Sequence, residues 1–294
     1  MPALKCALDQ AFARLELSPH PERAQLDAET LLLHVLGKNK AWLLAHREEE
    51  ISPDRAARYD TLVERRYAGE PIQYITGQQE FYGLLLHVSP AVLIPRPETE
   101  LLVETILHLL PEDARIVDVG TGSGAIAIAL AVHLPNAEIT ALDISPEALT
   151  IAATNASEHN VSDRIHLHPS NLLSALRPNE ASVWSCQGFD AIVSNPPYIP
   201  ESDRASLHPQ VREHEPAAAL FAGSDGLDLY RRLIPQAYAV LKPNGLLALE
   251  IGHGQREALA ALLQTWREVS FIDDLQQIPR VVLARKSTEP SQNS

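Results

Sequence analysis

The first part of the chain, residues 1 to about 70, carries apolar residues at helical spacing between polar ones. The segment 21–37 predicts an amphipathic helix, because its leucines and valine fall on one side at 3.6 residues per turn. Gly37 follows it as a typical stop signal. The predicted apolar face consists of Leu26, Leu31, Leu32, Leu33 and Val35. A small helical domain is therefore expected at this end of the chain.

A further helix and a hairpin follow. The segment 52–69 predicts a helix with Ser52 as its N-cap and Pro53 at the first helical position. The pattern then changes, and residues 79–90 predict two short strands that turn at Gly83. We expect this hairpin to connect two domains.

From residue 115 onward, short apolar runs alternate with longer amphipathic stretches. Strands are expected at 115–120, 137–143, 164–170, 189–195 and 245–252, with two late strands within 269–285. Helices are expected at 95–110, 123–134, 145–159, 225–241 and 257–266. Regular alternation of this kind is typical of an α/β fold with a parallel, Rossmann-like sheet.

These patterns divide the 294 residues into four parts. They are a helical domain at 1–72, a hairpin linker at 73–95, an α/β domain at 96–286 and a tail at 287–294 that is expected to be disordered. Within the α/β domain, residues 198–224 are polar and have little periodicity. Loops of that length in compact domains are often functional.

Composition and charge narrow the class of protein. The chain is 45% apolar and 21% charged, which is typical of a soluble globular protein, and no apolar run approaches the roughly 20 residues of a membrane span. The N-terminus lacks the long apolar core of a secretory signal, and Cys6 and Cys186 offer neither a disulfide framework nor a metal site. A cytoplasmic location is expected. The formal net charge of −14 argues against duplex DNA as a substrate without excluding it, because a local basic patch can hide in the total.

A glycine-rich loop is the first candidate site. It lies between an expected strand and an expected helix, and Asp143 ends the next strand at the position where a carboxylate can accept the hydroxyls of a ribose. The candidate cofactor-binding residues of this region are Gly120, Thr121, Gly122, Ser123, Gly124 and Asp143. A dinucleotide-binding unit and a purely structural turn are the alternatives. Asp118 completes a D-x-G-x-G-x-G pattern, which resembles the first motif of S-adenosylmethionine-dependent methyltransferases.

The stretch "SNPPY" is the second candidate site, since it ends the fourth strand of the α/β series. In such a sheet, ligands bind outside the carboxyl ends of the strands, so Asn195 is expected to face the same crevice as the glycine loop. The Asn195 side-chain oxygen and the Pro196 carbonyl can both accept hydrogen bonds from one NH₂ group, and Tyr198 can stack on the flat group that carries it. Asn195, Pro196 and Tyr198 are the candidate catalytic residues, and Pro197 joins them as a candidate substrate contact. Asn195 is also a candidate cofactor contact. A rigid strand-ending turn, with the tyrosine as packing, is the alternative.

Six stretches of the chain together resemble one enzyme family, and the similarity covers most of its length. They are "GEPIQYITGQQEFYGLLLHVSPAVLIPRPETE", "DVGTGSGAIAIAL", "SNPPYIP", "EPAAALFAGSDGLDLYRRLI", "LEIG" and "IPRVVLAR". The family is the PrmC/HemK protein-(glutamine-N5) methyltransferases, which modify the glutamine of the Gly-Gly-Gln motif in peptide-chain release factors. The resemblance implies a class I methyltransferase sheet, S-adenosylmethionine as cofactor and a release factor as protein substrate, docked by the N-terminal helices.

The same resemblance extends the candidate site and shows where this chain departs from the family. An acidic residue and an aromatic one usually follow the third strand, where this chain has Asn171 and Leu172. Asn171 can still accept from an adenine amine, whereas the stacking ring is lost. Gln277 stands where a glycine is usual. No metal is expected, and the chain is expected to act as a monomer without nucleic acid or membrane.

Two other functions remain open at this point. The N-P-P-Y motif is shared with methyltransferases that act on adenine or guanine amines in nucleic acid. A module that only binds S-adenosylmethionine is the third possibility, although cofactor binding alone gives no reason for "NPPY" at the crevice.

Overall fold

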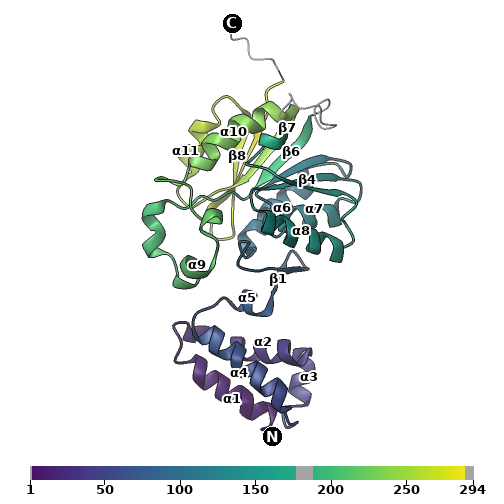
Figure 1. Cartoon of the computed structure of the whole chain (residues 1–294). Coiled ribbons are helices and arrows are strands. Elements are labelled where there is room, and N and C mark those ends of the chain that lie inside the picture. Colours follow the sequence, from purple (N-terminus) through teal and green to yellow (C-terminus); the bar gives the residue numbers. More distant parts are fainter. Residues whose placement is uncertain (1, 177–187, 289–294) are drawn as a thin grey trace. The chain divides into compact units, whose positions relative to one another are not determined.

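The computed structural model describes residues 2–176 and 188–288 (Figure 1). The chain forms two compact units, one of Met1–Gln78 with His208–His214 and one of Gln79–Leu207 with Glu215–Ser294. Most of the predicted tail, from residue 289 on, and Cys186 lie outside the described residues.

The first unit is helical, as expected. Gly37 adopts a left-handed φ of 64° and ends the second helix, and Pro53 opens the fourth directly after Ser52. The Ser52 side chain, however, makes no capping hydrogen bond. The helices are α1 (Leu4–Leu15), η1 (Pro21–Arg23), α2 (Ala24–Leu36), α3 (Lys40–Ala45), α4 (Pro53–Tyr67), α5 (Ile72–Thr76) and α9 (Pro209–His214).

The predicted apolar face of α2 is correct except at one residue. Leu31 and Leu32 are completely buried, but Leu26 is 50% exposed. Leu26 lies five residues before Leu31, which turns it about 140° away around the helix. Asp27 takes the inner position instead and accepts a hydrogen bond of 2.6 Å from the Arg66 Nε of α4. The core of this unit thus contains an ion pair that the apolar pattern did not predict.

The predicted hairpin consists of β1 (Gln78–Phe81) and β2 (Leu84–His87). Tyr82 and Gly83 at its tip have φ of 50° and 74°, which is the geometry of a tight hairpin turn. The Asn155 side chain holds β2 by accepting from the His87 N–H and donating to the His87 carbonyl.

The second unit is built on a seven-stranded sheet in the order β5-β4-β3-β6-β7-β9-β8. The five strands from β5 to β7 in this order run parallel to one another, and β9 runs antiparallel to both β7 and β8. The bounds are β3 (Arg115–Val119), β4 (Glu138–Asp143), β5 (Ile165–Pro169), β6 (Phe189–Ser194), β7 (Leu241–Glu250), β8 (Arg267–Asp273) and β9 (Pro279–Arg285). The strand order reverses between β3 and β6, and crevices at such switch points are where α/β sheets bind ligands.

Helices cover both faces of this sheet (Figure 1). One apolar layer lies under α6 (Pro97–Leu109), α7 (Ala125–His133) and α8 (Pro146–Glu158), and the other lies under α10 (Asp228–Val240) and α11 (Arg256–Leu262). Successive strand residues alternate between the two layers, as Ile116 and Val117 of β3 do. The expected α/β fold is therefore confirmed.

Residues 198–224 contain more structure than their polar pattern indicated. They include η3 (Glu201–Ser206), α9 and η4 (Ala217–Ala219), and Ile199 exchanges backbone hydrogen bonds with Leu220 and Ala222. Helices of three to six residues are too short to leave an apolar period in a sequence. Among all the helices of the described ranges, none has the length and apolar content needed to cross a bilayer.

Candidate functional site

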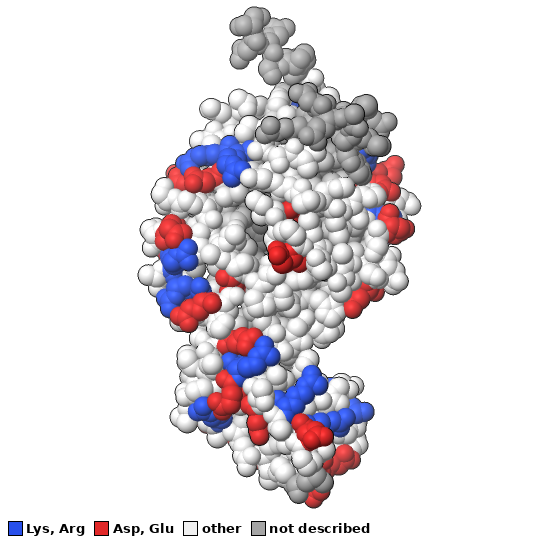
Figure 2. Space-filling model, viewed as in Figure 1, with Lys and Arg blue, Asp and Glu red and all other residues white. Residues whose placement is uncertain are grey.

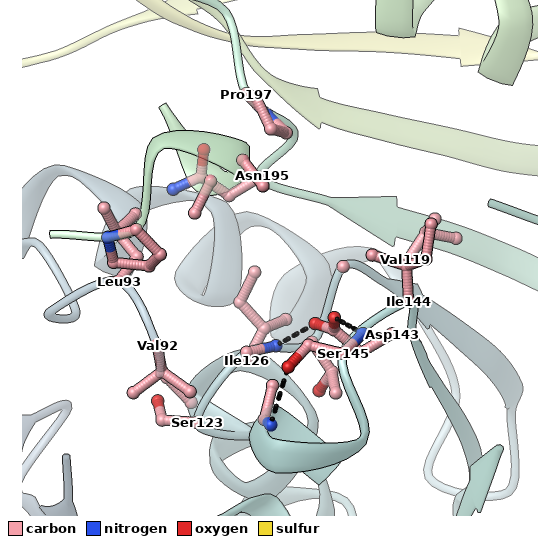
Figure 3. A pocket seen from close by; sticks show the side chains of 18 of the residues that line it. Val92, Leu93, Val119, Ser123, Ile126, Asp143, Ile144, Ser145, Asn195 and Pro197 are labelled. Carbon is pink, nitrogen blue, oxygen red and sulfur yellow. Dashed lines mark hydrogen bonds between the residues drawn. The ribbon is translucent and has the colours of Figure 1, made fainter. Parts of the chain in front are cut away.

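A cavity of about 620 Å³ opens at the carboxyl ends of β3, β4 and β6, within the second unit. Figure 3 shows side chains from the glycine loop, from the end of β4 and from the "NPPY" segment around one space. The candidate residues that line it are Gly120, Thr121, Gly122, Ser123, Asp143, Asn171, Leu172, Asn195 and Pro197. Both predicted sites thus border the same cavity.

Three candidate residues do not line the cavity: Gly124, Pro196 and Tyr198. Gly124 has a φ of 82°, and a Cβ there would come within 2.8 Å of the Ile128 side chain and 3.3 Å of Ala152. The third glycine of the loop therefore allows α7 to pack closely on α8. Gly122 is different, because no atom lies within 4 Å of its would-be Cβ and it borders the cavity.

Asp143 joins the end of β4 to the glycine loop. Its Oδ2 accepts from the Gly122 N–H at 2.8 Å, and its Oδ1 accepts from the Ser145 N–H at 2.9 Å. The Ser145 hydroxyl in turn caps α8 by accepting from the Ala148 N–H. Each carboxylate oxygen can accept more than one hydrogen bond, so Asp143 can hold two ligand hydroxyls while keeping its own contacts.

Asp118 lies behind the loop, completely buried and away from the cavity lining. It accepts a 2.6 Å hydrogen bond from the Thr121 hydroxyl, while its Oδ1 has no partner among the described residues. Burial raises the pKa of Asp118 to about 7. The side chain therefore supports the loop from beneath, at an electrostatic cost.

Asn195 is held by a chain of hydrogen bonds that leads from the cavity into the core. Its Nδ2 donates to the Thr99 hydroxyl at 3.0 Å, and that hydroxyl donates to Glu250 Oε2 at 2.6 Å. Glu250 is 1% exposed, and burial raises its pKa to about 7. Thr99 comes from the first turn of α6 and Glu250 from the end of β7, so three separate elements meet at this amide.

Tyr198 joins the same chain of hydrogen bonds through Glu250. Its hydroxyl donates to Glu250 Oε1 at 3.4 Å, and its carbonyl accepts from the Gln255 side chain at 3.0 Å. Its ring packs against the second apolar layer, and burial raises the pKa of the phenol above its ordinary value. The structure thus places the tyrosine where it supports Glu250.

The ends of β3 and β6 are linked directly. The buried Ser194 hydroxyl donates to the Val119 carbonyl at 2.6 Å. Because Gly120 and Asn195 are the next residues on each strand, this bond fixes the start of the glycine loop beside the start of "NPPY".

The Asn171 oxygen already has a partner. Arg232 of α10 donates to it at 2.6 Å, and Arg232 itself lines the cavity. Leu172 has an unusual left-handed φ of 54°, held by the Ser170 hydroxyl that donates to the Leu172 carbonyl at 2.7 Å. A ligand that meets Asn171 therefore shares its oxygen with a guanidinium.

Glu215 is a structural residue of the site that its sequence context did not indicate. It is buried, it accepts from the Ile94 N–H at 3.2 Å, and it forms an ion pair with Arg96, which lines the cavity. Pro216, the next residue, also lines the cavity. The stretch "EPAAALFAG" begins at Glu215, but the sequence does not identify its partners, because they lie about 120 positions earlier in the chain.

Among the described residues, no group of three or more His, Cys, Asp or Glu side chains is arranged to hold a metal ion.

Two family profiles match this chain. The profile described as "PrmC N-terminal domain" matches residues 7–77, and the profile described as "Methyltransferase small domain" matches residues 97–211.

Solved structures with a similar fold include the hMettl16 catalytic domain in complex with MAT2A 3'UTR hairpin 6. Its TM-score is 0.54 at 18% identity, covering 86% of this chain and 94% of that one. The T. thermophilus 16S rRNA N2 G1207 methyltransferase in complex with AdoMet and guanosine has a TM-score of 0.52 at 19% identity, covering 71% of this chain and 49% of that one. Similarity at this level supports the class I methyltransferase fold alone.

Full-length relatives are much closer in sequence. The release factor glutamine methyltransferase of Koribacter versatilis is 45% identical over 287 residues, which cover 97% of this chain and 99% of the relative. The enzyme of the same name from Escherichia coli is 42% identical over 281 residues, covering 95% and 97%. With the glycine loop, Asp143 and Asn195 around one cavity, and with such identity over nearly its full length, this chain belongs to the family of release factor glutamine methyltransferases.

Proposed function

We propose that this protein methylates the side-chain amide nitrogen, N5, of the glutamine in the Gly-Gly-Gln motif of a peptide-chain release factor, with S-adenosylmethionine as methyl donor. The observation that carries the proposal is the oriented Asn195 amide across one cavity from the glycine loop and Asp143. The family assignment supports the same reaction.

The residues of the cavity fit the cofactor. Gly122 leaves open space beside the loop, and the Asp143 carboxylate retains capacity for the two ribose hydroxyls. When bound, S-adenosylmethionine supplies an activated methyl group on a sulfonium. We assign Gly120–Ser123 and Asp143 to its binding, with Asn171 and Leu172 beside the adenine.

The acceptor side requires two hydrogen-bond acceptors for one NH₂ group. Among the described residues, neither Asn195 Oδ1 nor the Pro196 carbonyl oxygen accepts a hydrogen bond from the chain. We assign these two oxygens to the two hydrogens of a glutamine amide; Asn195 lines the cavity, and Pro196 is the next residue along the chain. The two hydrogen bonds draw electron density toward the amide nitrogen, whose lone pair is otherwise delocalised into the carbonyl.

The transfer itself is a displacement at carbon. A nitrogen–carbon bond forms as the carbon–sulfur bond breaks, the bonding pair leaves on sulfur as a neutral thioether, and the nitrogen then loses one proton to solvent. Asn195 is no strong base, which suits a proton that leaves only as methylation occurs. The protein therefore contributes mainly alignment, which can account for roughly 7–11 kcal/mol of a barrier.

The distribution of charged side chains favours a protein substrate over a nucleic acid. Figure 2 shows that, on the face it presents, the described basic side chains lie beside acidic ones and do not gather into a broad basic area. Arg231 pairs with Asp225 and Arg204 with Glu201, for example. Nucleic-acid binding draws most of its affinity from unpaired cations that neutralise phosphates.

We propose further that the helical domain at 1–72 docks the release factor, and that the protein works as a monomer in the cytoplasm. The match of the "PrmC N-terminal domain" profile to residues 7–77 supports a family-specific role for these helices.

The decisive experiment incubates the purified full chain with methyl-labelled S-adenosylmethionine and one of three substrates. These are a release factor, the same factor with the Gly-Gly-Gln glutamine changed to alanine, and ribosomal RNA or DNA. Label on the intact factor alone is expected. Label on nucleic acid instead would assign the enzyme to adenine or guanine amines, and no label on any substrate would favour a binding module.

A further inference from the structure

The Asn195 side-chain amide contacts the Thr99 hydroxyl. The oxygen and nitrogen of an asparagine amide differ little in size, so hydrogen-bond partners fix the orientation. The reaction proposed above needs the oxygen toward the substrate, because a substrate NH₂ group must be accepted and not opposed by a second donor.

Glu250 sets the direction in which the hydrogen bonds of this chain are donated. An ionised carboxylate only accepts, and Glu250 accepts from Thr99 at 2.6 Å and from Tyr198 at 3.4 Å. Its backbone is also fixed, since the Tyr230 hydroxyl donates to the Glu250 carbonyl at 2.7 Å. Thr99 has a single hydroxyl proton, and that proton is used on Glu250.

Thr99 can therefore only accept from Asn195. It does so from Nδ2 at 3.0 Å, which leaves Oδ1 without a donor from the described residues. Thr99 is 4% exposed and Glu250 is 1% exposed, so the bond between them is shielded from water, whereas Asn195 is half-buried at the cavity. An amide turned by 180° would oppose its oxygen to the Thr99 oxygen with no proton between them, which is unfavourable for buried groups.

We propose that Thr99 is a positioning residue, polarised by Glu250, that holds the Asn195 oxygen toward the acceptor nitrogen. This inference rests on the proposed function for the identity of that nitrogen, but the orientation of the amide does not depend on it. It also gives "PETE" and "LEIG" a shared role, because Thr99 and Glu250 come from those two stretches.

The test compares two substitutions that differ in one group. Thr99→Val keeps the shape and removes the hydroxyl, whereas Thr99→Ser keeps the hydroxyl and removes the methyl. Thr105→Val is the matched control, because Thr105 lies on the same helix and its hydroxyl donates only to the Leu101 carbonyl. Assays run at about pH 8.5, above the pKa of Glu250 of about 7, with saturating cofactor.

We expect Thr99→Val to lower kcat on the release factor about 10- to 100-fold, as for loss of one oriented polar group. The KM for the factor and the Kd for S-adenosylmethionine should change less than about threefold, since Thr99→Val keeps the shape at this position of the cavity and retains the glycine loop, Asp143 and Asn195. Thr99→Ser should restore most of kcat, and Thr105→Val should match the wild type. Equal kcat in Thr99→Val and the wild type, or an equal loss in Thr99→Ser, would overturn the proposal.

A second readout does not depend on the substrate. The side-chain NH₂ signals of Asn195, assigned by their loss in Asn195→Asp, report directly on its hydrogen bond to Thr99. Slow solvent exchange in the wild type and Thr99→Ser, with fast exchange in Thr99→Val, is expected. If the wild type failed to methylate the factor while this pattern held, the proposed function would fall and the positioning role would stand. Unchanged exchange in Thr99→Val would refute the positioning role itself.

Discussion

The Asp143 carboxylate accepts a hydrogen bond from the backbone N–H of Gly122 at 2.8 Å, so the acid at the end of β4 and the loop after β3 are one mechanical unit. A ligand held by the acid is thereby placed against the loop. Loss of the carboxylate should affect both at once.

Asp143→Ala is accordingly expected to weaken S-adenosylmethionine binding about 10- to 100-fold, because it removes the hydroxyl acceptor and loosens the loop. Isothermal titration calorimetry measures this affinity. Asp190→Ala is the control. Asp190 also accepts from a backbone N–H, that of Arg115, but it lies at the amino ends of the strands, away from the cavity. Similar affinity losses in the two variants would indicate a general loss of structure.

Asn195→Ala should abolish methyl transfer and leave cofactor affinity within about threefold of the wild type. The amide acts on the acceptor nitrogen, and removing one oriented group of this kind typically costs about 10²–10³ in kcat. Single-turnover transfer of labelled methyl, with calorimetry on the same preparations, separates the two effects. Normal transfer by this variant would refute the assigned role of "NPPY".

The buried pair of Asp27 and Arg66 is expected to matter far more than an exposed pair on the same helix. The two side chains are 2% and 3% exposed and 2.6 Å apart. Asp27→Ala leaves an uncompensated buried guanidinium and should destabilise the helical unit by about 3–5 kcal/mol.

Glu64→Gln is the matched control, because it removes the exposed pair of Glu64 with Arg14 and should change stability little. Hydrogen exchange of α2 and α4 peptides measures the helical unit separately from the sheet. Equal protection in both variants would show that the buried pair is dispensable.

Stability of the sheet unit should fall as pH rises from about 4 to about 7. Burial raises the pKa of Asp118 and of Glu250 to about 7 in the folded protein, above their ordinary values of 3.8 and 4.5. In that window the folded state binds protons that the unfolded state has released, so raising the pH favours unfolding, and the loss is complete above about pH 7.

Asp118→Asn should remove the Asp118 part of this dependence, roughly 2–4 kcal/mol between the two limits, and leave the Glu250 part. Hydrogen exchange of β3 and β6 peptides, corrected for intrinsic exchange rates at each pH, gives the comparison. An unchanged slope in the variant would mean that Asp118 is ionised in the fold across the whole range.

Much of the fold was predictable because its signals are local. The alternation of strands and helices after residue 115, Gly83 in the hairpin and Ser145 before α8 each follow from a few neighbouring residues. Leu26 was misplaced because its position about 140° from Leu31 was not weighed; what the apolar pattern could not show is that Asp27, paired with Arg66, occupies the inner position.

The candidate site was predictable as far as sequence motifs extend. Strand ends brought the glycine loop, Asp143 and Asn195 together, as parallel topology requires. Sequence could not show that Gly124 serves helix packing or that the Tyr198 hydroxyl bonds to Glu250, since both depend on side chains from distant segments. Glu215 and Arg232 were missed for the same reason.

The hydrogen bond from Ser194 to the Val119 carbonyl has a consequence for how such enzymes change substrates. Adjacent strands lie about 4.8 Å apart, so the sheet sets the distance between the glycine loop after β3 and Asn195 after β6. This distance cannot change unless the sheet itself changes. Under our proposal that the helical domain docks the release factor, we expect differences in substrate between related enzymes to arise outside the sheet. The sheet therefore fixes the geometry of methyl transfer, while the segments around it can vary.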